Sequence, residues 1–436
     1  MAAELLTTNR DLLDAVLACL DGYSALRAGA SCKAFRDAVA SSELIWQRYY
    51  ESSFANCNFV FATAVSWSRR FRIAHQRVRL RRLRWRRASA RCVSGQWPGS
   101  RQGASSCVVG DVSGGMFIVY GGWTDTGGIR RDLNVLRRRA GAVEGAVGEW
   151  QWQPVLVGHR ENGPARPTYG PSITAVPAGR ERVRLVVHGG VCAGGYRGAQ
   201  PALNILELTA ETATESSADA DGGAAPLPGL QAQWLAEGSL EGAPRAYHSA
   251  TFVPRGAVHE SHSERIWVFG GFDDRVAEGR IAQLAAYELA TREWEAVEAT
   301  PAPCARLGHS AVEMGGKLFV SGGCTDSSNM KPGERGEELS DVWLLDLAAP
   351  PSDLVWQCVS PPGRSPAGAL HRCHAAAPLG RCILYFGGGR SGQLTNGVCA
   401  FDTARAQWVV APRPPSGPPP SARQNAQCGI FPGTGL

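Results

Sequence analysis

The sequence predicts a small all-α helical bundle followed by an all-β propeller of five complete four-stranded blades plus an incomplete sixth. Two observations predict the propeller. A short apolar run ends in two consecutive glycines five times, and a tryptophan follows the first glycine of each pair after 21 to 45 residues. A third observation, helical spacing of apolar residues in the first 60 positions, predicts the bundle. A repeating unit that cannot bury its own apolar face must stack on its neighbours, as in propellers and solenoids.

Each glycine pair is expected to end the second strand of a blade. The pairs are Gly121-Gly122, Gly189-Gly190, Gly270-Gly271, Gly322-Gly323 and Gly387-Gly388. A strand that turns sharply beside another backbone needs residues that adopt positive φ and carry no Cβ. We therefore expect a close approach between two chain segments at every pair.

A proline and an arginine precede the first strand of four repeats. These leading arginines are Arg101, Arg166, Arg245 and Arg306, and after two intervening residues stand Ala104, Tyr169, His248 and His309. The fifth repeat has His371 in place of the arginine and keeps His374. We interpret the glycine pairs, the tryptophans and these histidines as packing residues.

The third and fourth strands follow each glycine pair. The third strands are expected at residues 132–136, 203–208, 284–289, 341–346 and 398–402, and the fourth strands carry Trp152, Trp234, Trp294, Trp356 and Trp408. One indole per unit buries about 150–250 Å². We expect it to pack where neighbouring sheets face each other.

These elements, repeated in the same order, resemble the kelch repeat: an R-x-x-H-S-A strand, a strand ending in Gly-Gly, a V-Y-x-x-D strand and a Trp strand. The resemblance covers about residues 98 to 431 and implies a β-propeller over 98–436. Residues 422–431 are similar to another first strand and 85–93 to a fourth strand, so the two could pair in an incomplete sixth blade and cover exposed edges. The alternative is that the chain is part of a longer protein. Residues 211–230 are predicted to be a disordered insertion in the second blade.

Residues 1–60 are predicted to form a helical domain. Its first helix carries a stripe made of Leu12, Leu13, Val16, Leu17 and Leu20. Asp21-Gly22 ends that helix, a second begins at Ser24, a third holds Cys32 and Phe35, and the segment closes on residues 44–50. About 50 residues bury too little surface for a robust core, which indicates stabilisation by a partner.

The leucine spacing, together with Ser24-Ala25-Leu26-Arg27, Ser31–Phe35 and Ile45-Trp46, resembles an F-box, although Thr8-Asn9 stand where that family has Leu-Pro. An F-box followed by kelch repeats implies a non-catalytic substrate receptor of a Skp-cullin-F-box ubiquitin ligase. The implied partners are a Skp-family adaptor, a cullin and a target protein. The implied Skp-binding residues are Leu12, Leu13, Val16, Leu17, Leu20, Leu26 and Trp46.

The kelch resemblance also implies a target site on the rim of the propeller, where the turn after Gly-Gly and the turn before the first strand lie together. The implied substrate-binding residues are Arg101, Trp123, Arg130, Arg166, Tyr196, Arg197, Arg245, Asp273, Arg275, Arg306, Arg335 and Arg390. Two hypotheses remain for the leading arginines. They converge as a cationic ring for carboxylates or phosphates, or each pairs within its own blade.

The net charge of +6 comes from one segment, because residues 69–91 hold eleven arginines and no acidic residue. We assign residues 61–97 to an arginine-rich linker helix and a lead-in strand. Its apolar residues recur at helical spacing, which favours a rigid linker. A nuclear-import signal and a nucleic-acid or phosphoinositide surface are the alternatives.

The composition indicates a soluble protein of the cytoplasm, the nucleus or both. Acidic and basic residues interrupt the only N-terminal apolar stretch, and no run reaches the roughly 18 apolar residues of a membrane span. Thirteen scattered cysteines without a C-x-x-C pair favour reduced thiols over disulfides or zinc. We expect no metal, no cofactor and no catalytic site, since the patterns of copper or iron propeller enzymes and of phosphate-binding loops are missing. A non-ligase kelch scaffold, cytoskeletal or nuclear, is the alternative function.

Overall fold

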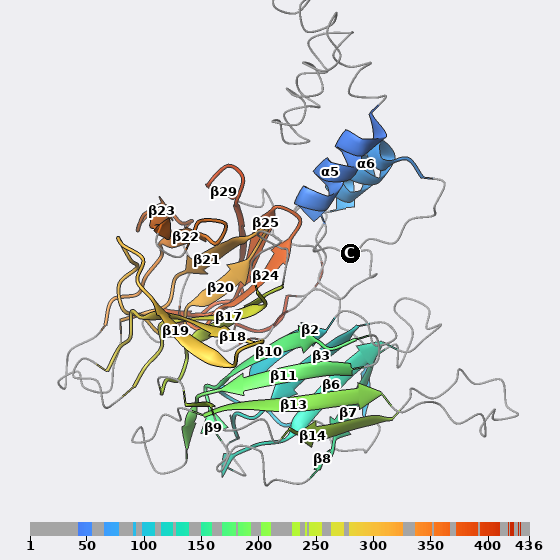
Figure 1. The fold of residues 1–436 in the computed structure, drawn as a ribbon, viewed down its shortest axis with the longest axis vertical. Coiled ribbons are helices and arrows are strands. Elements are labelled where there is room, and N and C mark those ends of the chain that lie inside the picture. The colour runs from blue at the N-terminus through green and yellow to red at the C-terminus, as the bar shows by residue number, and fades with distance from the viewer. Residues whose placement is uncertain are drawn as a thin grey trace, which may run out of the picture.

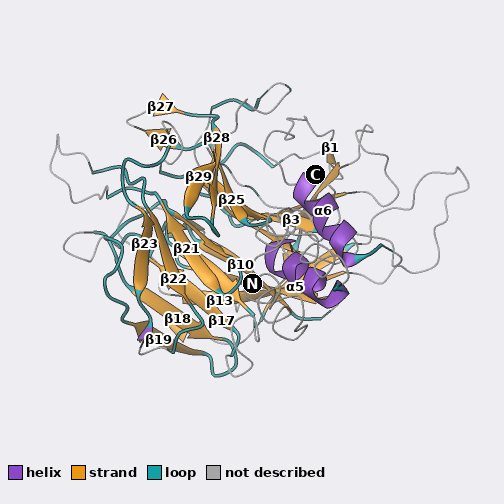
Figure 2. Ribbon diagram, turned by 90° about the horizontal axis from the view of Figure 1, so that it is seen from above, coloured by secondary structure: helices purple, strands orange, loops and turns teal. Residues whose placement is uncertain are grey.

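The structure is a computed structural model. It describes residues 42–54, 65–77, 90–92, 98–109, 115–124, 128–138, 150–158, 168–179, 182–192, 202–210, 229–235, 240–241, 244–254, 263–273, 279–325, 336–350, 353–366, 372–390 and 393–409, together with 417, 419–422, 426 and 428. Strands make up most of this regular structure, and two helices lie together at one side (Figure 2). No helix in these ranges is long and apolar enough to cross a membrane.

The first two blades are antiparallel sheets with short additional strands, one in blade 1 and two in blade 2. Blade 1 contains β2 (Ser105–Val109), β3 (Met116–Tyr120), β6 (Leu133–Arg138) and β7 (Trp150–Val155), and blade 2 contains β10 (Ser172–Pro177), β11 (Arg182–His188), β13 (Ala202–Ala210) and β14 (Leu230–Trp234). The short strands β1 (Ala90–Cys92) and β8 (Val157–Gly158) pair in parallel with β7 and β14. β15 (Leu240–Glu241) pairs with the start of β13, opposite β11 and therefore on the same side as β14.

Blades 3 to 5 have four antiparallel strands each. They are β16 (Ser249–Val253), β17 (Arg265–Phe269), β18 (Leu284–Glu288) and β19 (Glu293–Val297); β20 (Ser310–Glu313), β21 (Lys317–Ser321), β22 (Val342–Asp346) and β23 (Trp356–Ser360); and β24 (Ala375–Leu379), β25 (Cys382–Phe386), β28 (Val398–Asp402) and β29 (Gln407–Val409). The first strands β2, β10, β16, β20 and β24 contact one another in succession. Figure 1 shows the resulting series of blades.

The predicted strands are confirmed, but the blade count is corrected to five. The described residues form five large sheets and three small two-stranded ones. The lead-in strand β1 does not begin a sixth blade, because it lies against the outer strand of blade 1 in parallel. The strand expected at 422–431 falls mostly outside the described residues, as does the insertion at 211–228 between β13 and β14.

Helices α5 (Glu43–Phe54) and α6 (Trp67–Arg77) share an aromatic core. Trp46 is completely buried, with its ring centroid 5.7 Å from that of Tyr49 and 5.3 Å from that of Phe71. The ring of Phe54 lies 5.2 Å from Phe71. The backbone N–H of Trp67 donates to the Glu43 carboxylate at 2.7 Å, so an α5 side chain caps the start of α6. Residues 1–41 lie outside the described part of the chain.

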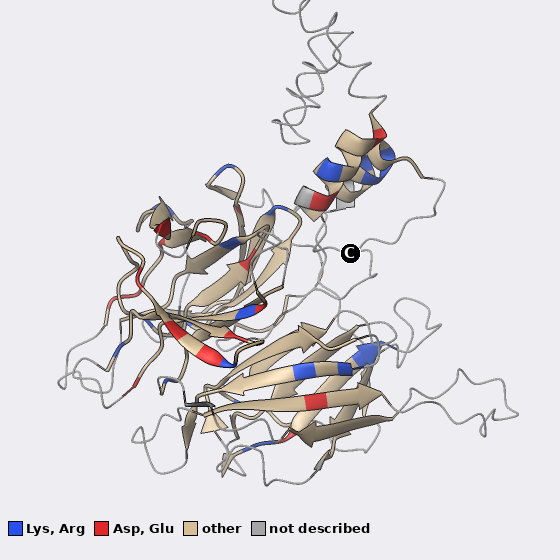
Figure 3. Cartoon of the chain, in the orientation of Figure 1, with Lys and Arg blue, Asp and Glu red and all other residues tan. Residues whose placement is uncertain are grey.

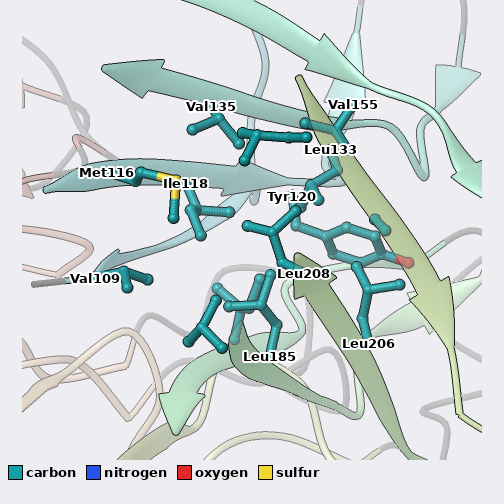
Figure 4. Close-up of a cluster of buried hydrophobic side chains, with 14 of the residues drawn as sticks. Val109, Met116, Ile118, Tyr120, Leu133, Val135, Val155, Leu185, Leu206 and Leu208 are labelled. Carbon is teal, nitrogen blue, oxygen red and sulfur yellow. The ribbon is translucent and has the colours of Figure 1, made fainter. Parts of the chain in front are cut away.

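Each successive pair of blades buries a shared apolar cluster. Between blades 1 and 2, Tyr120 and Leu133 meet Leu206 and Leu208 (Figure 4). Equivalent clusters join blades 2 and 3, 3 and 4, and 4 and 5. The interface cores confirm that each sheet completes its burial against a neighbour.

Trp234 and Trp356 occupy these interfaces as predicted. Trp234 lies edge-on to Tyr120 at 6.2 Å, and Trp356 lies 5.3 Å from Phe269. In both cases the tryptophan of one blade contacts the residue that precedes Gly-Gly in the blade before it. A single indole therefore covers one end of each of these two junctions.

The glycine pairs adopt the predicted conformation. All ten residues have φ between +62° and +102°. A Cβ on Gly271 would lie 2.8 Å from the carbonyl oxygen of Ala246, closer than real Cβ atoms come to backbone. The glycines are therefore required by both the turn and the approach of the next segment.

Candidate protein-binding rim of the propeller

The rim is built from two short segments in every blade. The turn after Gly-Gly pairs with the segment that leads into the first strand, through the bridges Gln102–Trp123, Ala246–Phe272, Leu307–Cys324 and Arg372–Gly389 and through β9 (Thr168–Tyr169) with β12 (Val191–Cys192). Small hairpins extend the turns in blades 1 and 5: β4 (Trp123–Thr124) with β5 (Gly128–Ile129), and β26 (Gly389–Arg390) with β27 (Gln393–Leu394). The two turns thus lie together, as the kelch resemblance implied.

A chain of backbone hydrogen bonds connects the blades beside the rim. Its five equivalent residues are Gly103, Gly170, Tyr247, Gly308 and Cys373. The N–H of each of the last four donates to the carbonyl of the equivalent residue in the blade before it, at 2.7 to 3.1 Å. All five have positive φ, including Tyr247 and Cys373, for which this conformation is unfavourable. The bonds hold the leading segments of consecutive blades at a fixed spacing.

Arg306 is a structural residue inside blade 4. Its side chain is fully buried and forms two hydrogen bonds with the Asp341 carboxylate, at 2.7 and 2.9 Å. It also donates to the carbonyl of Gly322 at 3.1 Å, so it fixes the glycine turn. Burial alone would lower the pKa of Arg306, but the Asp341 carboxylate outweighs burial and raises it.

Blade 1 repeats this arrangement nearer the solvent. Arg101 donates to both oxygens of Asp132 at 2.9 and 3.0 Å and to the carbonyl of Gly121 at 3.0 Å. The Asp132 side chain is 43% exposed. Burial works to raise the pKa of Asp132, but hydrogen bonds from Arg101 and Asn134 hold it below its usual value.

Blade 3 replaces one member of the pair and blade 2 replaces both, because the register puts Ala202 at the position of the acid. Arg245 is 1% exposed and donates to the Gln283 side chain at 3.0 Å and to the carbonyl of Gly270 at 3.1 Å, while burial lowers its pKa to about 10. In blade 2 the strand register pairs Ser172 with His188, which places Thr168 where the other blades have the arginine. Arg166 lies outside the described residues.

The leading arginines therefore follow the second of the two hypotheses. Arg101, Arg245 and Arg306 all bind groups of their own blade. The cationic ring is not found at these positions, because each guanidinium points into its blade and is satisfied there. A bidentate contact to carboxylate or carbonyl groups keeps the turn in place.

The strand histidines join neighbouring blades as packing residues. The Nε2 atoms of His248, His309 and His374 each lie 2.9 Å from the hydroxyl of a serine in the preceding blade, namely Ser172, Ser249 and Ser310. The pKa of His309 is lowered to about 3. Burial is the largest cause, and repulsion from Arg306 adds to it. The imidazoles of His248 and His309 are therefore neutral. In blade 2 the register assigns Pro171, not Tyr169, to the histidine position.

The residue directly after Gly-Gly has a large apolar side chain in blades 1, 2 and 3. Of these three described residues, Trp123 of blade 1 is the one whose side chain is exposed. Its equivalents Val191 and Phe272 are 0% and 3% exposed, whereas Trp123 is 42% exposed. Arg130 is also exposed on this hairpin, and its Nε lies 3.4 Å from the Thr124 hydroxyl. An exposed indole beside a guanidinium is a typical composition of a protein-binding hot spot.

The remaining predicted substrate-binding residues are not brought together by the described structure. Asp273 is 5% exposed and therefore buried. Arg390 belongs to β26. The residues outside the described ranges are Arg166, Tyr196, Arg197, Arg275 and Arg335.

Of the predicted Skp-binding residues, only Trp46 is described, and its ring is fully buried between α5 and α6. It stabilises the helix pair and is not on the surface. The others, Leu12, Leu13, Val16, Leu17, Leu20 and Leu26, lie outside the described residues.

Sequence reasoning missed several rim residues. Tyr169 and Tyr247 form an edge-on aromatic pair at 6.2 Å, and both are half-buried. Leu394 of β27 is 48% exposed. In each repeat, the residue just before the histidine position lies beside the rim turn. The place of Tyr247 between Arg245 and His248 could therefore have indicated from the sequence that it belongs to the rim.

The described residues contain no group of three or more His, Cys, Asp or Glu side chains that could hold a metal ion. The ten cysteines in these ranges are free thiols. What the rim offers is a surface with aromatic, cationic and amide groups.

Comparison with protein families identifies the repeats. Residues 232–433 match the KLHDC2/KLHL20/DRC7 Kelch-repeats domain. This range runs from β14 through blades 3 to 5. Blades 1 and 2 repeat the same strand order and glycine turns.

Individual relatives share about a third of the chain. Multiple epidermal growth factor-like domains protein 8 of Mus musculus is 34% identical over 36% of this chain and 5% of its own length. The tRNA wybutosine-synthesizing protein 2/3/4 of Arabidopsis thaliana is 30% identical over 35% of this chain and 14% of its own length. Host cell factor 1 of Rattus norvegicus is 29% identical over 35% of this chain and 8% of its own length. The chain spans a small fraction of these relatives, whose names differ widely. Residues 232–433 are therefore similar to a kelch-repeat domain, and blades 1 and 2 continue the same propeller.

Proposed function

We propose that the chain is a non-catalytic substrate receptor of a Skp-cullin-F-box ubiquitin ligase. The observation that carries this proposal is the F-box-like leucine spacing of residues 12–20 directly ahead of a kelch propeller. The helical segment would bind the Skp adaptor, which links to the cullin. The rim would hold the target protein.

Such a receptor acts by geometry. Holding a target near a ubiquitin-charged enzyme raises the effective concentration of the reacting groups. No catalytic side chain is required on this chain. A rigid connection between the helices and the propeller would make the positioning more effective.

The packing of α5 against α6 supports a receptor in which the helical segment binds the adaptor and the rim holds the target. Trp46, at the end of the F-box-like segment, packs against Phe71 of α6, so its ring contributes to the core. Adaptor binding would then fall to the leucine stripe of residues 12–20. The helix pair would transmit the position of the adaptor to the following chain.

The adaptor contact is tested by replacing both Leu13 and Leu17 with aspartate. Skp and cullin are expected to co-purify with the wild type and to fall to background with the variant, because two carboxylates cannot be desolvated in an apolar interface without several kcal/mol of cost. The control is Leu156→Asp, since Leu156 is 90% exposed on the propeller between β7 and β8.

Equal retention of Skp by the wild type and the double variant would contradict the ligase role. A wild type that retains a stable partner but no Skp or cullin would establish the alternative, a non-ligase kelch scaffold. The Thr8-Asn9 departure from the F-box pattern favours that alternative.

The target contact is tested at blade 1. Trp123→Ala is expected to weaken target binding about 30-fold, the effect of losing a hot spot worth about 2 kcal/mol. The control Val355→Ala removes an apolar side chain of similar exposure, 45%, at the opposite end of a blade, because the neighbouring Trp356 pairs with Leu345 and Leu345 pairs with Leu318 near the start of the second strand. Isothermal titration calorimetry with a target captured by the wild type measures both, and equal effects would exclude Trp123 from the contact.

A further inference from the structure

The segment of residues 69–91 is not used by the proposed receptor function. It contains eleven arginines, no lysine and no acidic residue. Its first part is α6, where the structure describes both the buried and the exposed side chains. The placement of those side chains decides what the arginines can bind.

The apolar side of α6 is already covered by protein. Phe71 and Ala74 are fully buried, and Phe71 contacts Trp46 and Phe54 of α5. Residues three apart lie on the same side of a helix. Arg69 and Arg72 are three apart and both are exposed, so they form a basic stripe on the side that does not pack.

This basic stripe is not neutralised within the described part of the chain. No ion pair is formed there by Arg69 or Arg72. The two acids of α5 are engaged otherwise, because Glu43 accepts from the Trp67 N–H and Glu51 accepts from the Gln47 amide at 2.8 Å. Figure 3 shows basic residues on both helices.

We propose that the basic stripe of α6, formed by Arg69 and Arg72, binds the sugar-phosphate backbone of a nucleic acid. Guanidinium groups donate two parallel hydrogen bonds to phosphate and stack on bases. Neutralising a row of phosphates releases counterions and drives binding without sequence preference. A segment that carries arginine throughout, and never lysine, suits this contact.

Two features of α6 favour nucleic acid over a membrane surface. A helix that lies on a bilayer needs an unpartnered apolar face to bury among the lipids. Phe71 and Ala74 occupy that face and are covered by α5. What α6 offers outward is charge, which matches a phosphate backbone.

The test measures binding of the full chain to a fluorescein-labelled 20-nucleotide RNA and to a 20-base-pair DNA duplex by anisotropy, over a range of salt. The wild type is expected to bind at least one with micromolar affinity at low salt. Arg69→Gln with Arg72→Gln should weaken binding about tenfold. For the single strand it should also reduce the slope of log K against log salt by about 1.4, which is about 0.7 for each phosphate that the variant no longer neutralises.

The matched control is Arg364→Gln with Arg405→Gln, which removes the same charge from exposed positions of the propeller. It should bind as the wild type does. Arg69→Glu with Arg72→Glu should weaken binding further, and unchanged thermal unfolding would show that these exposed changes leave the fold intact.

The proposal is overturned if neither nucleic acid binds at 50 mM salt, or if the α6 and propeller pairs weaken binding equally. Binding only to vesicles of phosphatidylserine and phosphatidylcholine would also overturn it, in favour of a membrane surface. Skp binding by the Arg69/Arg72 variants is an independent measurement, so the ligase proposal stands or falls separately.

Discussion

Replacing Arg306 with methionine is expected to lower the free energy of unfolding by about 3–5 kcal/mol, the cost of breaking a buried ion pair. The substitution leaves the Asp341 carboxylate 5% exposed and without its guanidinium partner. It also removes the donor to the Gly322 carbonyl, so the turn after the second strand of blade 4 loses its anchor. Equilibrium urea unfolding measures the change.

Blade 1 supplies the matched comparison. Arg101→Met breaks the same bidentate pair, but the Asp132 side chain is 43% exposed and water can solvate it. Its cost should be nearer 1 kcal/mol, because exposed pairs contribute little. Combining Arg306→Met with Asp341→Leu should restore much of the missing stability, since no charge is then left buried. Equal costs in the two blades would show that burial of the acid does not set the energy.

Acid is expected to destabilise the propeller through its buried histidines. Burial, with repulsion from Arg245 and Arg306, lowers the pKa of His188 and of His309 to about 3. In the unfolded chain both imidazoles take up a proton near pH 6.5. Between pH 6.5 and 3 the unfolded state therefore binds more protons than the native state, and stability falls as pH falls. At pH 5 the loss is about 2 kcal/mol for each imidazole.

The contribution of one histidine is isolated with His309→Gln, which has no titrating group. Urea unfolding of the wild type and the variant should be compared at pH 7 and pH 5. The wild type should lose about 2 kcal/mol more than the variant over this interval. The same pH dependence in both proteins would contradict a neutral, buried His309.

The strands and their turns could be predicted from the sequence because each depends on local pattern. The apolar runs before Gly-Gly give the second strands, and positive φ at the glycines follows from the turn. The interface role of Trp234 and Trp356 followed from their size and their spacing. Every blade needs these features to pack on its neighbours, so they recur.

Features that depend on register or on distant partners were not predictable in the same way. Thr168 takes the arginine position in blade 2, because hydrogen-bonded pairing of Ser172 with His188 sets the alignment, and Arg166 stands two residues earlier. The parallel pairing of β1 with β7 has no signature in three residues.

A weaker sequence pattern could have predicted that the leading arginines pair within their own blades. Asp132 and Asp341 each begin a third strand, 31 and 35 residues after Arg101 and Arg306. An acid recurring at that place indicates a partner within the blade. The exposure of Trp123 had no such signal, because Phe272 is buried at the equivalent position.

We propose that one end of this chain recruits a ligase and that the other holds a target. The most direct test is affinity purification of the full chain from cells with the ligase held inactive, comparing the wild type with Leu13→Asp/Leu17→Asp and with Trp123→Ala. The account predicts that the first variant loses Skp and cullin but keeps its target, and that the second keeps Skp and cullin but loses the target. The proposal would be contradicted if either variant lost Skp, cullin and the target together. It would also be contradicted if both variants kept all of these partners.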